Sequence, residues 1–479
     1  MPLPTDRLAS WLLIGGLGLV ALVVRLVRLS YPPDLIFDEA YYPPEGFELL
    51  DFGYEYNRGY TFIVHPPLGK WFIAAGEYLF GYNSFGWRVP SALAGAIAVV
   101  LLARIVRRMT RSTLLGLVAG FLLAFDGLSF VLSRTGLLDI FLQPLVLAGF
   151  ACLLVDRDRY RDRFAQLVST VDGPLGMLGP RGGPRGWRLA AGIFFGLGCS
   201  VKWSGVYFLA GFALLSLLWD RAARKSAGVG RPTRGTAVRD LPGAAWALGA
   251  VPVLAYLLTW TGWFLGETSQ GRHWAEVNPD TSYPFIPGAL RSLWHMHGEM
   301  LTFHNGLSSS HPWESKPWSW LVDGRPILLW NPQGITDDSG GQIVRYILMV
   351  GTPALWFAFA PALLWMVWRL LAYRDWRAAA ALVGISAGWL SWFANLERTM
   401  FIFYMAPVVP FFVMAVTLAL GDVLGRADAG ATRRQLGLGA LCLYLAVVLL
   451  NFAFFFPILT GLPLSYDDWL ARMWFPSWF

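Results

Sequence analysis

The segment Ile36-Phe37-Asp38-Glu39-Ala40-Tyr41-Tyr42 follows shortly after the first long apolar run of the chain, residues 8–29. It sets two neighbouring carboxylates among apolar and aromatic side chains, which indicates a partly dry site close to a membrane surface. One loop later the chain reads His65-Pro66-Pro67-Leu68-Gly69-Lys70, where two prolines fix the backbone before the chain turns back toward the membrane. The remaining apolar runs are interpreted around these two segments.

The composition is that of a polytopic helical membrane protein. Of the 479 residues, 56% are hydrophobic and 14% are charged, whereas a soluble domain carries about 25% charged residues. The mean hydropathy of +0.49 and repeated apolar runs of about 20 residues support the same class. The net charge of +7 is explained by basic loops on one side of the membrane and requires no nucleic-acid partner. Cys152, Cys199 and Cys442 lie in apolar runs and are interpreted as small core residues, not disulfide partners or metal ligands.

The apolar runs predict about eleven transmembrane helices. The run 189–219 is broken at Lys202 and lies between two basic loops, 156–188 and 220–240, so we expect it to cross twice as two short helices. Because loops rich in Lys and Arg stay in the cytoplasm, this arrangement places the N-terminus inside and the C-terminus outside. The other predicted spans are residues 8–29, 89–106, 112–132, 137–155, 243–264, 343–371, 378–394, 400–420 and 437–458.

With this topology, residues 1–479 form one all-α membrane domain with its active site on external loops. Residues 30–87 form the first external loop, which carries the acidic pair, and residues 265–342 form the long external loop. Residues 460–479 form an aromatic, amphipathic tail that we expect in the outer interface. The first span lacks a cleavage site of the signal-peptide type, so it is interpreted as an anchor.

The first external loop holds the first candidates for chemistry. A carboxylate of Asp38 or Glu39 in a partly dry setting can have a raised pKa and act as a general base. The alternative is that the acidic pair is simply solvated. His65 and Lys70 flank the two prolines and can be aimed at one spot, or else they belong to a rigid turn with an interfacial lysine.

Arginines stand at the external ends of the first two predicted spans. Arg88 lies at the outer mouth of the second span, where it either pairs bidentately with a phosphate or extends to lipid headgroups. Arg25 and Arg28 end the first span and share one helical face. They either extend to headgroups or help to hold an anionic lipid headgroup.

Two further sites bring charges close to apolar segments. Arg134 and Asp139 bracket the turn between the third and fourth spans together with Asp126, and Lys202 lies in the predicted turn of the run 189–219. A charged side chain close to an apolar membrane segment costs free energy. Such charges therefore indicate either function or tight pairing, for example between Arg134 and Asp139. All of them are expected on the external side of the membrane.

The long external loop contains several histidines and tryptophans. The histidines lie within 17 residues, at His295, His297, His304 and His311. His295-Met296-His297 is a weak signal for a metal site, but no carboxylate or cysteine falls at convincing ligand spacing. The sequence therefore shows no required cofactor, and a divalent metal ion is an open alternative without support. Trp313, Trp318, Trp320 and Trp330 form either a wall on the acceptor side or an interfacial belt.

The predicted external surface thus gathers an acidic pair, a histidine and several cations. Cations suit an anionic leaving group, and a carboxylate suits the activation of a hydroxyl group. This pattern fits the transfer of a group from a membrane-embedded lipid-phosphate donor to an external acceptor.

Several motifs in this order resemble those of the protein O-mannosyltransferase family, and the resemblance runs through most of the chain. The acidic pair alone is shared by many lipid-dependent glycosyltransferases, but its combination with His-Pro-Pro and Lys-Trp-Ser-Gly is specific. The motifs are Phe37-Asp38-Glu39, His65-Pro66-Pro67-Leu68-Gly69-Lys70, Trp87-Arg88-Val89-Pro90-Ser91-Ala92-Leu93, Leu132-Ser133-Arg134-Thr135-Gly136-Leu137-Leu138-Asp139 and Gly196-Leu197-Gly198-Cys199-Ser200-Val201-Lys202-Trp203-Ser204-Gly205.

The resemblance implies a GT-C fold with eleven spans, a polyprenyl-phosphate mannose donor and inverting transfer of mannose to Ser or Thr hydroxyls of exported proteins. It implies that Asp38 is the catalytic base, that Glu39 is its acidic neighbour, and that Arg88 and either Arg25 or Arg28 are required. The loop 265–342 is too short for the β-trefoil MIR domain of eukaryotic members. This indicates a bacterial, actinobacterial-type member in the plasma membrane, where membrane lipids and the protein-export channel are candidate partners.

The residues that this reasoning assigns to the donor phosphate and sugar share positive charge or proximity to the external turns. They are His65, Lys70, Arg88, Arg134, Asp139, Arg25, Arg28 and Lys202.

A first alternative function is that of another GT-C transferase with a glycan or lipid acceptor. A second is a secondary transporter with a proton site at the acidic pair, but transporters place such sites in broken helices at mid-membrane, within internal repeats that this sequence lacks. A non-catalytic scaffold would leave the external charges unexplained.

Overall fold

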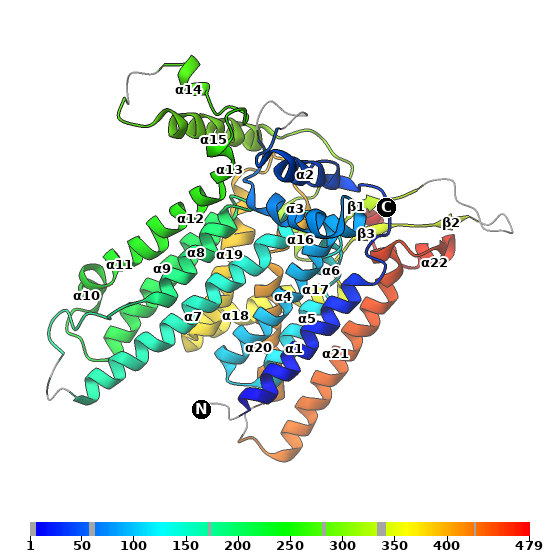
Figure 1. Ribbon diagram of the computed structural model, residues 1–479. Helices are drawn as coiled ribbons and strands as arrows, with labels where there is room; N and C mark the ends of the chain where they lie inside the picture. The colour runs from blue at the N-terminus through cyan, green and yellow to red at the C-terminus, as the bar shows by residue number, and fades with distance from the viewer. Residues whose placement is uncertain are drawn as a thin grey trace.

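The computed structural model describes residues 6–56, 63–170, 173, 175–279, 284–332, 342–425 and 428–479. Long helices run side by side, and short helices, strands and loops gather at one end of them (Figure 1). The helix α1 (Arg7–Leu26) begins at the opposite end, at the bottom of Figure 1, and the C-terminus lies beside the short elements at the top.

Within the described residues, seven helical segments are long and apolar enough to cross a membrane. They are α1, α4 (Ser84–Thr110), α7 (Asp139–Thr170), α9 (Gly205–Ser226), the segment Leu241–Thr259, the segment Pro353–Tyr373 and α21 (Ala431–Thr460). Four shorter helices accompany them, namely α5 (Thr113–Ala124), α8 (Gly186–Cys199), α19 (Trp376–Trp389) and α20 (Val409–Leu424). Each of the eleven predicted spans corresponds to one of these segments, and the predicted break near Lys202 separates α8 from α9.

Two of the long segments consist of consecutive pieces. The segment Leu241–Thr259 contains α11 (Leu241–Ala245), the π-helical turn η2 (Trp246–Ala250) and α12 (Val251–Thr259). The segment Pro353–Tyr373 contains α17 (Pro353–Trp356) and α18 (Phe359–Tyr373).

The structure corrects several predicted boundaries. The predicted span 112–132 breaks after α5, because Asp126 caps a second helix, α6 (Gly127–Leu132), by accepting a hydrogen bond from the Ser129 amide at 2.8 Å. The predicted span 343–371 starts with extended chain and becomes helical only at Pro353, a residue that favours the first helical turn. The polar loop that was predicted to start at residue 156 is helical as far as Thr170.

The helix α20 forms the centre of the bundle. Ten consecutive residues, Val409–Leu418, are buried, and α20 packs against α5, α18, α19 and α21. A helix that is apolar on all sides belongs in a core. By contrast, most of the apolar surface of α1 and α21 remains exposed and is available to lipid. The burial pattern therefore separates core helices from peripheral helices in a way that hydropathy does not.

The first external loop is mostly helical. It contains the 3-10 helix η1 (Phe37–Ala40), α2 (Tyr42–Phe52) and α3 (Leu68–Phe80), which packs on α2 and α4. The contact between α3 and α4 requires glycine, because a Cβ on Gly76 would lie 2.3 Å from the Gly86 carbonyl oxygen. This close packing fixes the position of α3 relative to α4.

The short elements at this end of the molecule, called the cap below, also come from the long external loop, the connection between α19 and α20, and the tail. The helices are α13 (Thr261–Leu265), α14 (Trp274–Val277), α15 (Gly288–Gly306), α16 (Pro317–Trp320), η3 (Leu390–Ala394), η4 (Ile402–Met405), α22 (Tyr466–Leu470) and η5 (Pro476–Trp478). On the remaining connection lies α10 (Pro232–Arg239). Two small antiparallel sheets add to the helices: β1 (Ile327–Trp330) pairs with β3 (Ile347–Met349), and β2 (Ile343–Val344) pairs with β4 (Leu464–Ser465).

The tail docks on the long external loop. Trp478 is fully buried, and its indole donates a hydrogen bond of 2.8 Å to the Asp323 carbonyl. In the same loop Trp320 is buried, whereas Trp318 is exposed. The tryptophans of this region therefore serve mainly in packing.

Candidate active site

The two neighbouring carboxylates of η1 point into different surroundings. Glu39 is fully buried and accepts four hydrogen bonds, two from the Arg88 guanidinium at 2.7 Å each, one from the Gly136 amide at 2.8 Å and one from the Ile36 amide at 3.1 Å. This set satisfies a buried carboxylate and leaves it no route to a substrate. The structure thus places Glu39 in the packing of η1 against α4, where its contacts are those of a positioning residue.

Arg88 is also fully buried and holds the first external loop against α4. Besides its pair with Glu39, its guanidinium donates hydrogen bonds to the carbonyls of Pro32 at 2.7 Å, Asp34 at 3.0 Å and Leu29 at 3.3 Å. Arg88, which the sequence placed at the donor phosphate, therefore directs its N–H groups at carbonyls and a carboxylate inside the protein and is not among the residues that line the cavity described below.

Asp38 is partly exposed and faces the opposite way. Its carboxylate accepts a hydrogen bond from the Tyr42 hydroxyl at 3.5 Å. Loss of hydration raises the pKa of Asp38 to about 6; the nearby Asp139 and Glu45 act in the same direction, and Lys202 opposes the shift. A carboxyl group with this pKa is ionised at neutral pH and more basic than an ordinary aspartate, which suits a general base.

The backbone at this site is held in an uncommon conformation. Phe37 has a φ of 51°, in the left-handed region, and its ring makes edge contacts with His311, Phe401 and Phe403. Side chains larger than glycine rarely adopt such a φ unless surrounding contacts enforce it. The aromatic contacts and the Glu39–Arg88 pair therefore fix the position of Asp38 from both sides.

A cavity of about 750 Å³ opens next to this acidic turn. Its polar end is lined by His65, Lys202, His304, Arg398 and Tyr404. The His65 ring lies 6.1 Å from the Tyr42 ring, which links the cavity to the hydroxyl that contacts Asp38. Of the residues predicted from the sequence, His65 and Lys202 line this cavity, and Asp139 reaches it through an ion pair of 2.7 Å with Lys202.

The other end of the cavity is apolar and extends along the membrane helices. It is lined by Val206 and Leu209 of α9 and by Leu248, Pro252 and Val253 of the η2–α12 segment. The cavity is roofed by Leu301, His304 and Asn305 of α15 and flanked by Ser391, Trp392 and Ala394 of η3. A ligand with a charged head and a long hydrocarbon chain matches this division into a polar end and an apolar end.

Two cations carry the charge of the polar end. Burial and the nearby Lys202, together with other cations, hold the pKa of His65 well below its ordinary value, and burial lowers the pKa of His304 to about 4, so both rings are neutral at pH 7. Lys202 is paired with Asp139, whereas Arg398 makes no ion pair among the described residues. Its guanidinium donates to the His304 carbonyl at 2.8 Å and to the Tyr404 hydroxyl at 3.2 Å. Arg398 therefore keeps a positive charge at the polar end that no described carboxylate pairs with directly.

Sequence reasoning missed Arg398, His304 as a cavity residue, and Tyr404. Arg398 lies between the predicted spans 378–394 and 400–420, where its charge at the external end of two apolar runs was a usable signal. The signal for His304 was weaker, because only the packing of α15 over the cavity distinguishes it from the other histidines of the loop. Among the described residues no group of three His, Cys, Asp or Glu side chains could hold a metal ion.

Lys70 does not reach the cavity. Its ammonium is fully buried and pairs with Glu45 at 3.0 Å and Glu55 at 2.5 Å, which joins α3 to both ends of the α2 region. Burial raises the pKa of Glu55 to about 8; the nearby Glu45 acts in the same direction, and Lys70 opposes the shift. The structure thus places Lys70, which the sequence assigned to the donor, in the packing of the first external loop.

Three further arginines that were predicted at the donor site lie elsewhere. Arg134 donates hydrogen bonds to the carbonyls of Arg25 at 2.6 Å, Val27 at 2.7 Å and Arg28 at 3.1 Å, so it caps the C-terminal end of α1. The Arg25 side chain is buried and donates to the carbonyls of Ala21 and Ala124. Arg28 is exposed and stacks on Tyr31 at 4.8 Å. None of the three is among the described residues that line the cavity.

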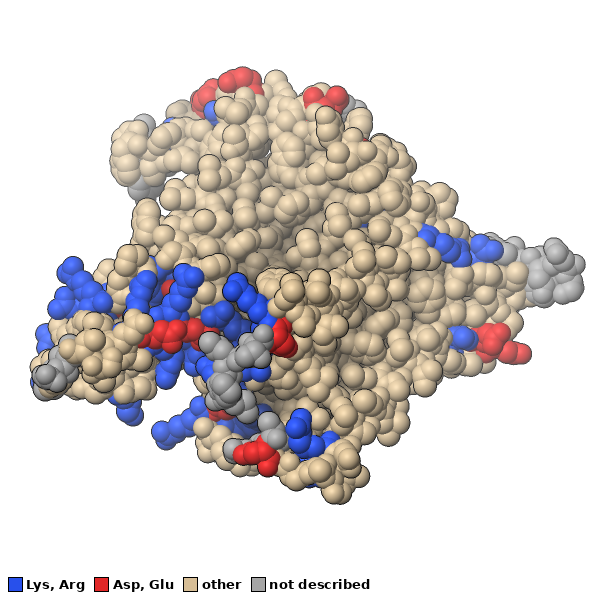
Figure 2. Space-filling model, turned by 60° about the horizontal axis from the view of Figure 1, so that its bottom comes forward, with Lys and Arg blue, Asp and Glu red and all other residues tan. Residues whose placement is uncertain are grey.

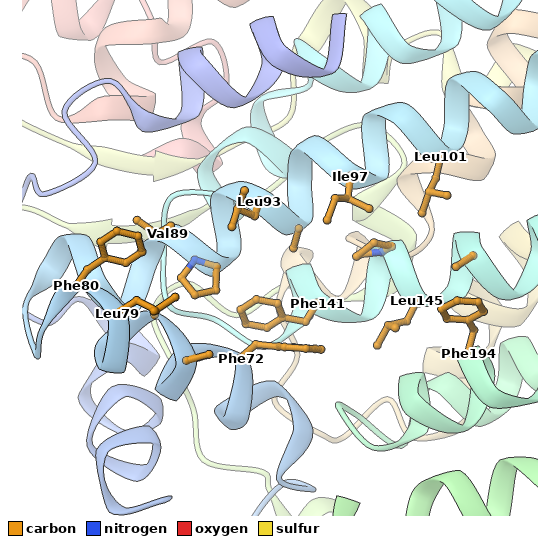
Figure 3. A pocket seen from close by; sticks show the side chains of 16 residues that line it. Phe72, Leu79, Phe80, Val89, Leu93, Ile97, Leu101, Phe141, Leu145 and Phe194 are labelled. Atoms are coloured by element: carbon orange, nitrogen blue, oxygen red, sulfur yellow. The ribbon is translucent and has the colours of Figure 1, made fainter. Parts of the chain in front are cut away.

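A second hollow, of about 380 Å³, lies on another side of α8 (Figure 3). Figure 3 shows Val89, Leu93, Ile97 and Leu101 along α4, facing side chains of α3, α7 and α8. All of its lining side chains are apolar, among them Phe72, Phe141 and Phe194. It offers no group for a phosphate or a sugar, so the cavity beside Asp38 is the better candidate for the active site.

The sequence matches three family profiles. Two are described as dolichyl-phosphate-mannose-protein mannosyltransferase and cover residues 16–87 and 64–171. The third is described as the C-terminal four-transmembrane region of protein O-mannosyltransferase and covers residues 289–478. Together they cover both the acidic turn and the residues that surround Arg398.

Curated relatives are similar over their whole length. A polyprenol-phosphate-mannose–protein mannosyltransferase of Mycobacterium tuberculosis (strain ATCC 25618 / H37Rv) is 46% identical over 99% of this chain and 93% of the relative. The protein of the same name from Corynebacterium glutamicum is 36% identical over 98% of this chain and 93% of the relative.

Two solved structures share the fold. One is the Saccharomyces cerevisiae protein O-mannosyltransferase Pmt1-Pmt2 complex bound to the sugar donor, with a TM-score of 0.74, 16% identity and coverage of 98% of this chain and 93% of that chain. The other is ArnT from Cupriavidus metallidurans bound to undecaprenyl phosphate, with a TM-score of 0.52, 16% identity and coverage of 98% and 79%. At this identity the likeness shows the GT-C fold alone.

Proposed function

Because the chain belongs to the protein O-mannosyltransferase family, we propose that it transfers mannose from a polyprenyl-phosphate mannose to Ser or Thr hydroxyl groups of exported proteins, with Asp38 as the general base. The relatives that share this chain's full length are named for a polyprenol-phosphate mannose donor and a protein acceptor. The observation that carries the mechanism is the cavity that joins an apolar slot to two cations beside Asp38.

The donor fits this cavity in one orientation. The prenyl chain occupies the apolar end between α9 and the η2–α12 segment, where Val206, Leu248 and Val253 line the slot. The phosphate lies at the polar end, close to Lys202 and Arg398, since charge-assisted hydrogen bonds from cations are the strong contacts of a phosphate. The mannose then lies between the phosphate and Asp38.

The transfer is a single displacement with inversion at the anomeric carbon. Asp38 accepts the proton of the Ser or Thr hydroxyl while the hydroxyl oxygen forms a bond to the anomeric carbon. The bond between that carbon and the phosphate oxygen breaks, and the polyprenyl phosphate leaves with the electron pair. Lys202 and Arg398 stabilise the negative charge that grows on the phosphate. Every group that this step needs comes from the chain or its substrates, and we propose that no metal ion takes part.

Glu39 and Arg88 contribute by positioning. Their buried pair holds η1 on α4, and η1 carries Asp38. Asp38 must stay within hydrogen-bond reach of the acceptor hydroxyl, because a misplacement of about 1 Å can cost a hundredfold in rate. The family resemblance implies that Arg88 is required, and this positioning role accounts for the requirement without a contact between Arg88 and the phosphate.

The proposed location is the bacterial plasma membrane, with the cavity outside and the N-terminus of the chain in the cytoplasm. In support, Figure 2 shows Lys and Arg side chains gathered on the end of the molecule opposite the cap, over the ends of the long helices. Cytoplasmic loops of membrane proteins carry such an excess of basic residues. In this orientation the cavity faces acceptors that have been exported.

The direct test uses purified protein, polyprenyl-phosphate mannose with a labelled sugar and a peptide rich in Ser, Thr and Pro. We expect labelled peptide, and activity that persists in EDTA. The variant Asp38→Asn should lower turnover by about 10²–10⁴-fold with donor binding kept. The variant Asp34→Asn is the matched control, because Asp34 is an exposed carboxylate on the same loop. Label on a glycan or lipid acceptor instead of the peptide would overturn the assigned acceptor, and wild-type turnover of Asp38→Asn would overturn the base.

A further inference from the structure

The end of the molecule away from the active site contains a separate pocket of about 460 Å³. It lies where the C-terminal part of α7 meets the start of α8, at the edge of the apolar segments. The polar and aromatic residues of its lining are Asp156, Arg159, Tyr160, Arg163, Arg185 and Trp187. The transfer reaction uses none of these residues.

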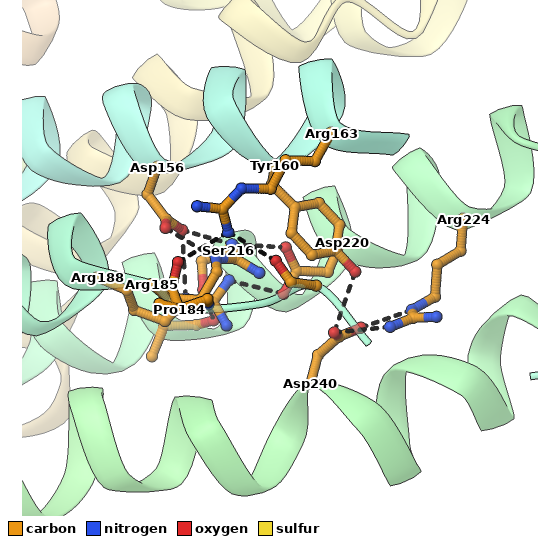
Figure 4. A network of polar contacts seen from close by, with 12 residues as sticks. Asp156, Tyr160, Arg163, Pro184, Arg185, Arg188, Ser216, Asp220, Arg224 and Asp240 are labelled. Carbon is orange, nitrogen blue, oxygen red and sulfur yellow. Dashed lines mark hydrogen bonds and ion pairs between the residues drawn. The ribbon is translucent and has the colours of Figure 1, made fainter. Parts of the chain in front are cut away.

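A buried ion network forms the floor of this pocket (Figure 4). Arg185 makes a two-pronged pair with Asp156 and reaches Asp220 at 3.0 Å, and Arg188 pairs with Asp220 at 2.6 Å. Next to these residues Arg224 makes a two-pronged pair with Asp240. Three carboxylates thus face three guanidinium groups, so the network as a whole is neutral and its acidic groups are already engaged.

Two arginines at the rim of the pocket are not part of this neutral network. Arg159 is exposed, stacks on the Trp187 ring at 5.3 Å and makes no hydrogen bond or ion pair with any described residue. One NH₂ group of Arg163 donates to the carbonyls of Gly182 and Pro184, at 2.8 Å each, and Arg163 pairs with no described carboxylate. The rim therefore carries two positive charges that no carboxylate of the pocket neutralises.

Nearby charges on α7 do not change this balance. Arg161 and Asp162 are both exposed and contribute one charge of each sign. Asp158 pairs with Arg108 at 2.8 Å and with Arg157 at 3.0 Å, so it is not free to neutralise the rim. An anion in the pocket would meet guanidinium groups that are held in place by an aromatic ring and by backbone carbonyls.

We propose that this pocket binds the phosphate of an anionic phospholipid in the leaflet opposite the active site. Guanidinium groups match phosphate oxygens in geometry and charge. Trp187 opens the apolar helix α8, and a tryptophan in such a place lies at headgroup depth, where it positions the pocket for a lipid phosphate. The depth is what favours a membrane lipid over free phosphate. The inference relies on the membrane orientation proposed above and is independent of the transfer reaction.

Native mass spectrometry of the full chain, released from nanodiscs of mixed phosphatidylglycerol and phosphatidylcholine, tests this site. We expect wild-type protein to retain phosphatidylglycerol preferentially. The double variant Arg159→Gln, Arg163→Gln should lose at least about tenfold of this preference, because each charged contact to the phosphate is removed. The matched control is Arg434→Gln, which removes an exposed arginine from the start of α21, at the same end of the long helices.

The outcomes are distinct. Equal phosphatidylglycerol retention by wild type and the double variant overturns the site, and so does an equal loss in the Arg434→Gln control. Displacement of the lipid by millimolar inorganic phosphate, without any preference among lipids, shows a phosphate site in place of a lipid site. If the double variant fails to fold, Arg159→Gln alone carries the test, because Arg159 makes no polar contact with any described residue.

Discussion

Substitution of Glu39 by Gln separates the two roles that we assign to neighbouring carboxylates. The Glu39 side chain keeps its size in this variant but loses its charge, and one of its two oxygens becomes an NH₂ group. In the wild-type protein each carboxylate oxygen of Glu39 accepts a hydrogen bond from Arg88. The NH₂ group of the variant would face N–H groups that it cannot accept from.

The magnitude follows from the burial of both partners. Glu39 and Arg88 are each fully buried, so Arg88 would keep its positive charge in the interior without a counter-charge. Removal of one partner of a buried ion pair typically costs about 3–5 kcal/mol. We therefore expect Glu39→Gln to lower the free energy of unfolding by about 3–5 kcal/mol and to lower turnover as well, because η1 loses its anchor on α4.

The assay is denaturant unfolding in detergent micelles, followed by tryptophan fluorescence, for Glu39→Gln, Arg88→Met and the double variant. Because the double variant removes both charges, its destabilisation should be clearly less than the sum of the two single effects. Asp38→Asn should show no comparable loss of stability, since burial already disfavours the ionised form of Asp38. Wild-type stability of Glu39→Gln, or additive effects in the double variant, would refute the clamp.

Three further predictions concern the cavity and the first external loop. With a pKa of about 6 for Asp38, kcat/KM should fall about tenfold per pH unit below pH 6, and a flat profile between pH 5 and 7 would contradict the base. Lys202→Gln and Arg398→Gln should each raise the KM for the lipid donor by roughly 10–100-fold, against an unchanged KM for the peptide. Burial raises the pKa of Glu77 to about 8 from an ordinary value of 4.5, so the folded protein keeps this carboxyl neutral at pH 7 while the unfolded chain ionises it. Stability should therefore fall as the pH rises from about 4.5 to 8. Glu77→Gln should remove the share of this dependence that comes from Glu77 and stabilise the protein at pH 7, as measured by thermal unfolding across that range; Glu55 and Asp38, whose pKa values are also raised, keep their own shares.

Hydropathy predicted the order of the helices, because each apolar run of the sequence contains helix; seven of the described segments are long and apolar enough to cross a membrane, and the others are shorter. It failed at boundaries that depend on single contacts. The break before α6 depends on Asp126, whose carboxylate caps that helix and accepts from the Trp356 indole at 2.7 Å. Trp356 lies 230 residues further along the chain, so the sequence around Asp126 contains no sign of this partner.

Only part of the site could be predicted from the sequence, because the partners of each charge lie far away along the chain. A search for charges near apolar segments finds Asp38, Lys202 and Asp139, and it finds Lys70 and Arg88 equally well. What distinguishes them is the partner of each charge. Lys202 lines a cavity, whereas Lys70 is enclosed by two carboxylates and Arg88 by Glu39 and three carbonyls. Such partners come from separate elements and become visible only when the chain is folded.

The acidic turn shows why a costly buried pair is retained next to the proposed base. Successive residues of a 3-10 helix point about 120° apart, so η1 can direct Glu39 inward and Asp38 toward the cavity. A buried ion pair adds little net stability compared with apolar packing, so stability alone does not explain it. It does fix orientation, because Glu39 accepts from α4, from the turn before α7 and from its own loop at once. The pair thereby holds Asp38 in one place relative to the cations of the cavity.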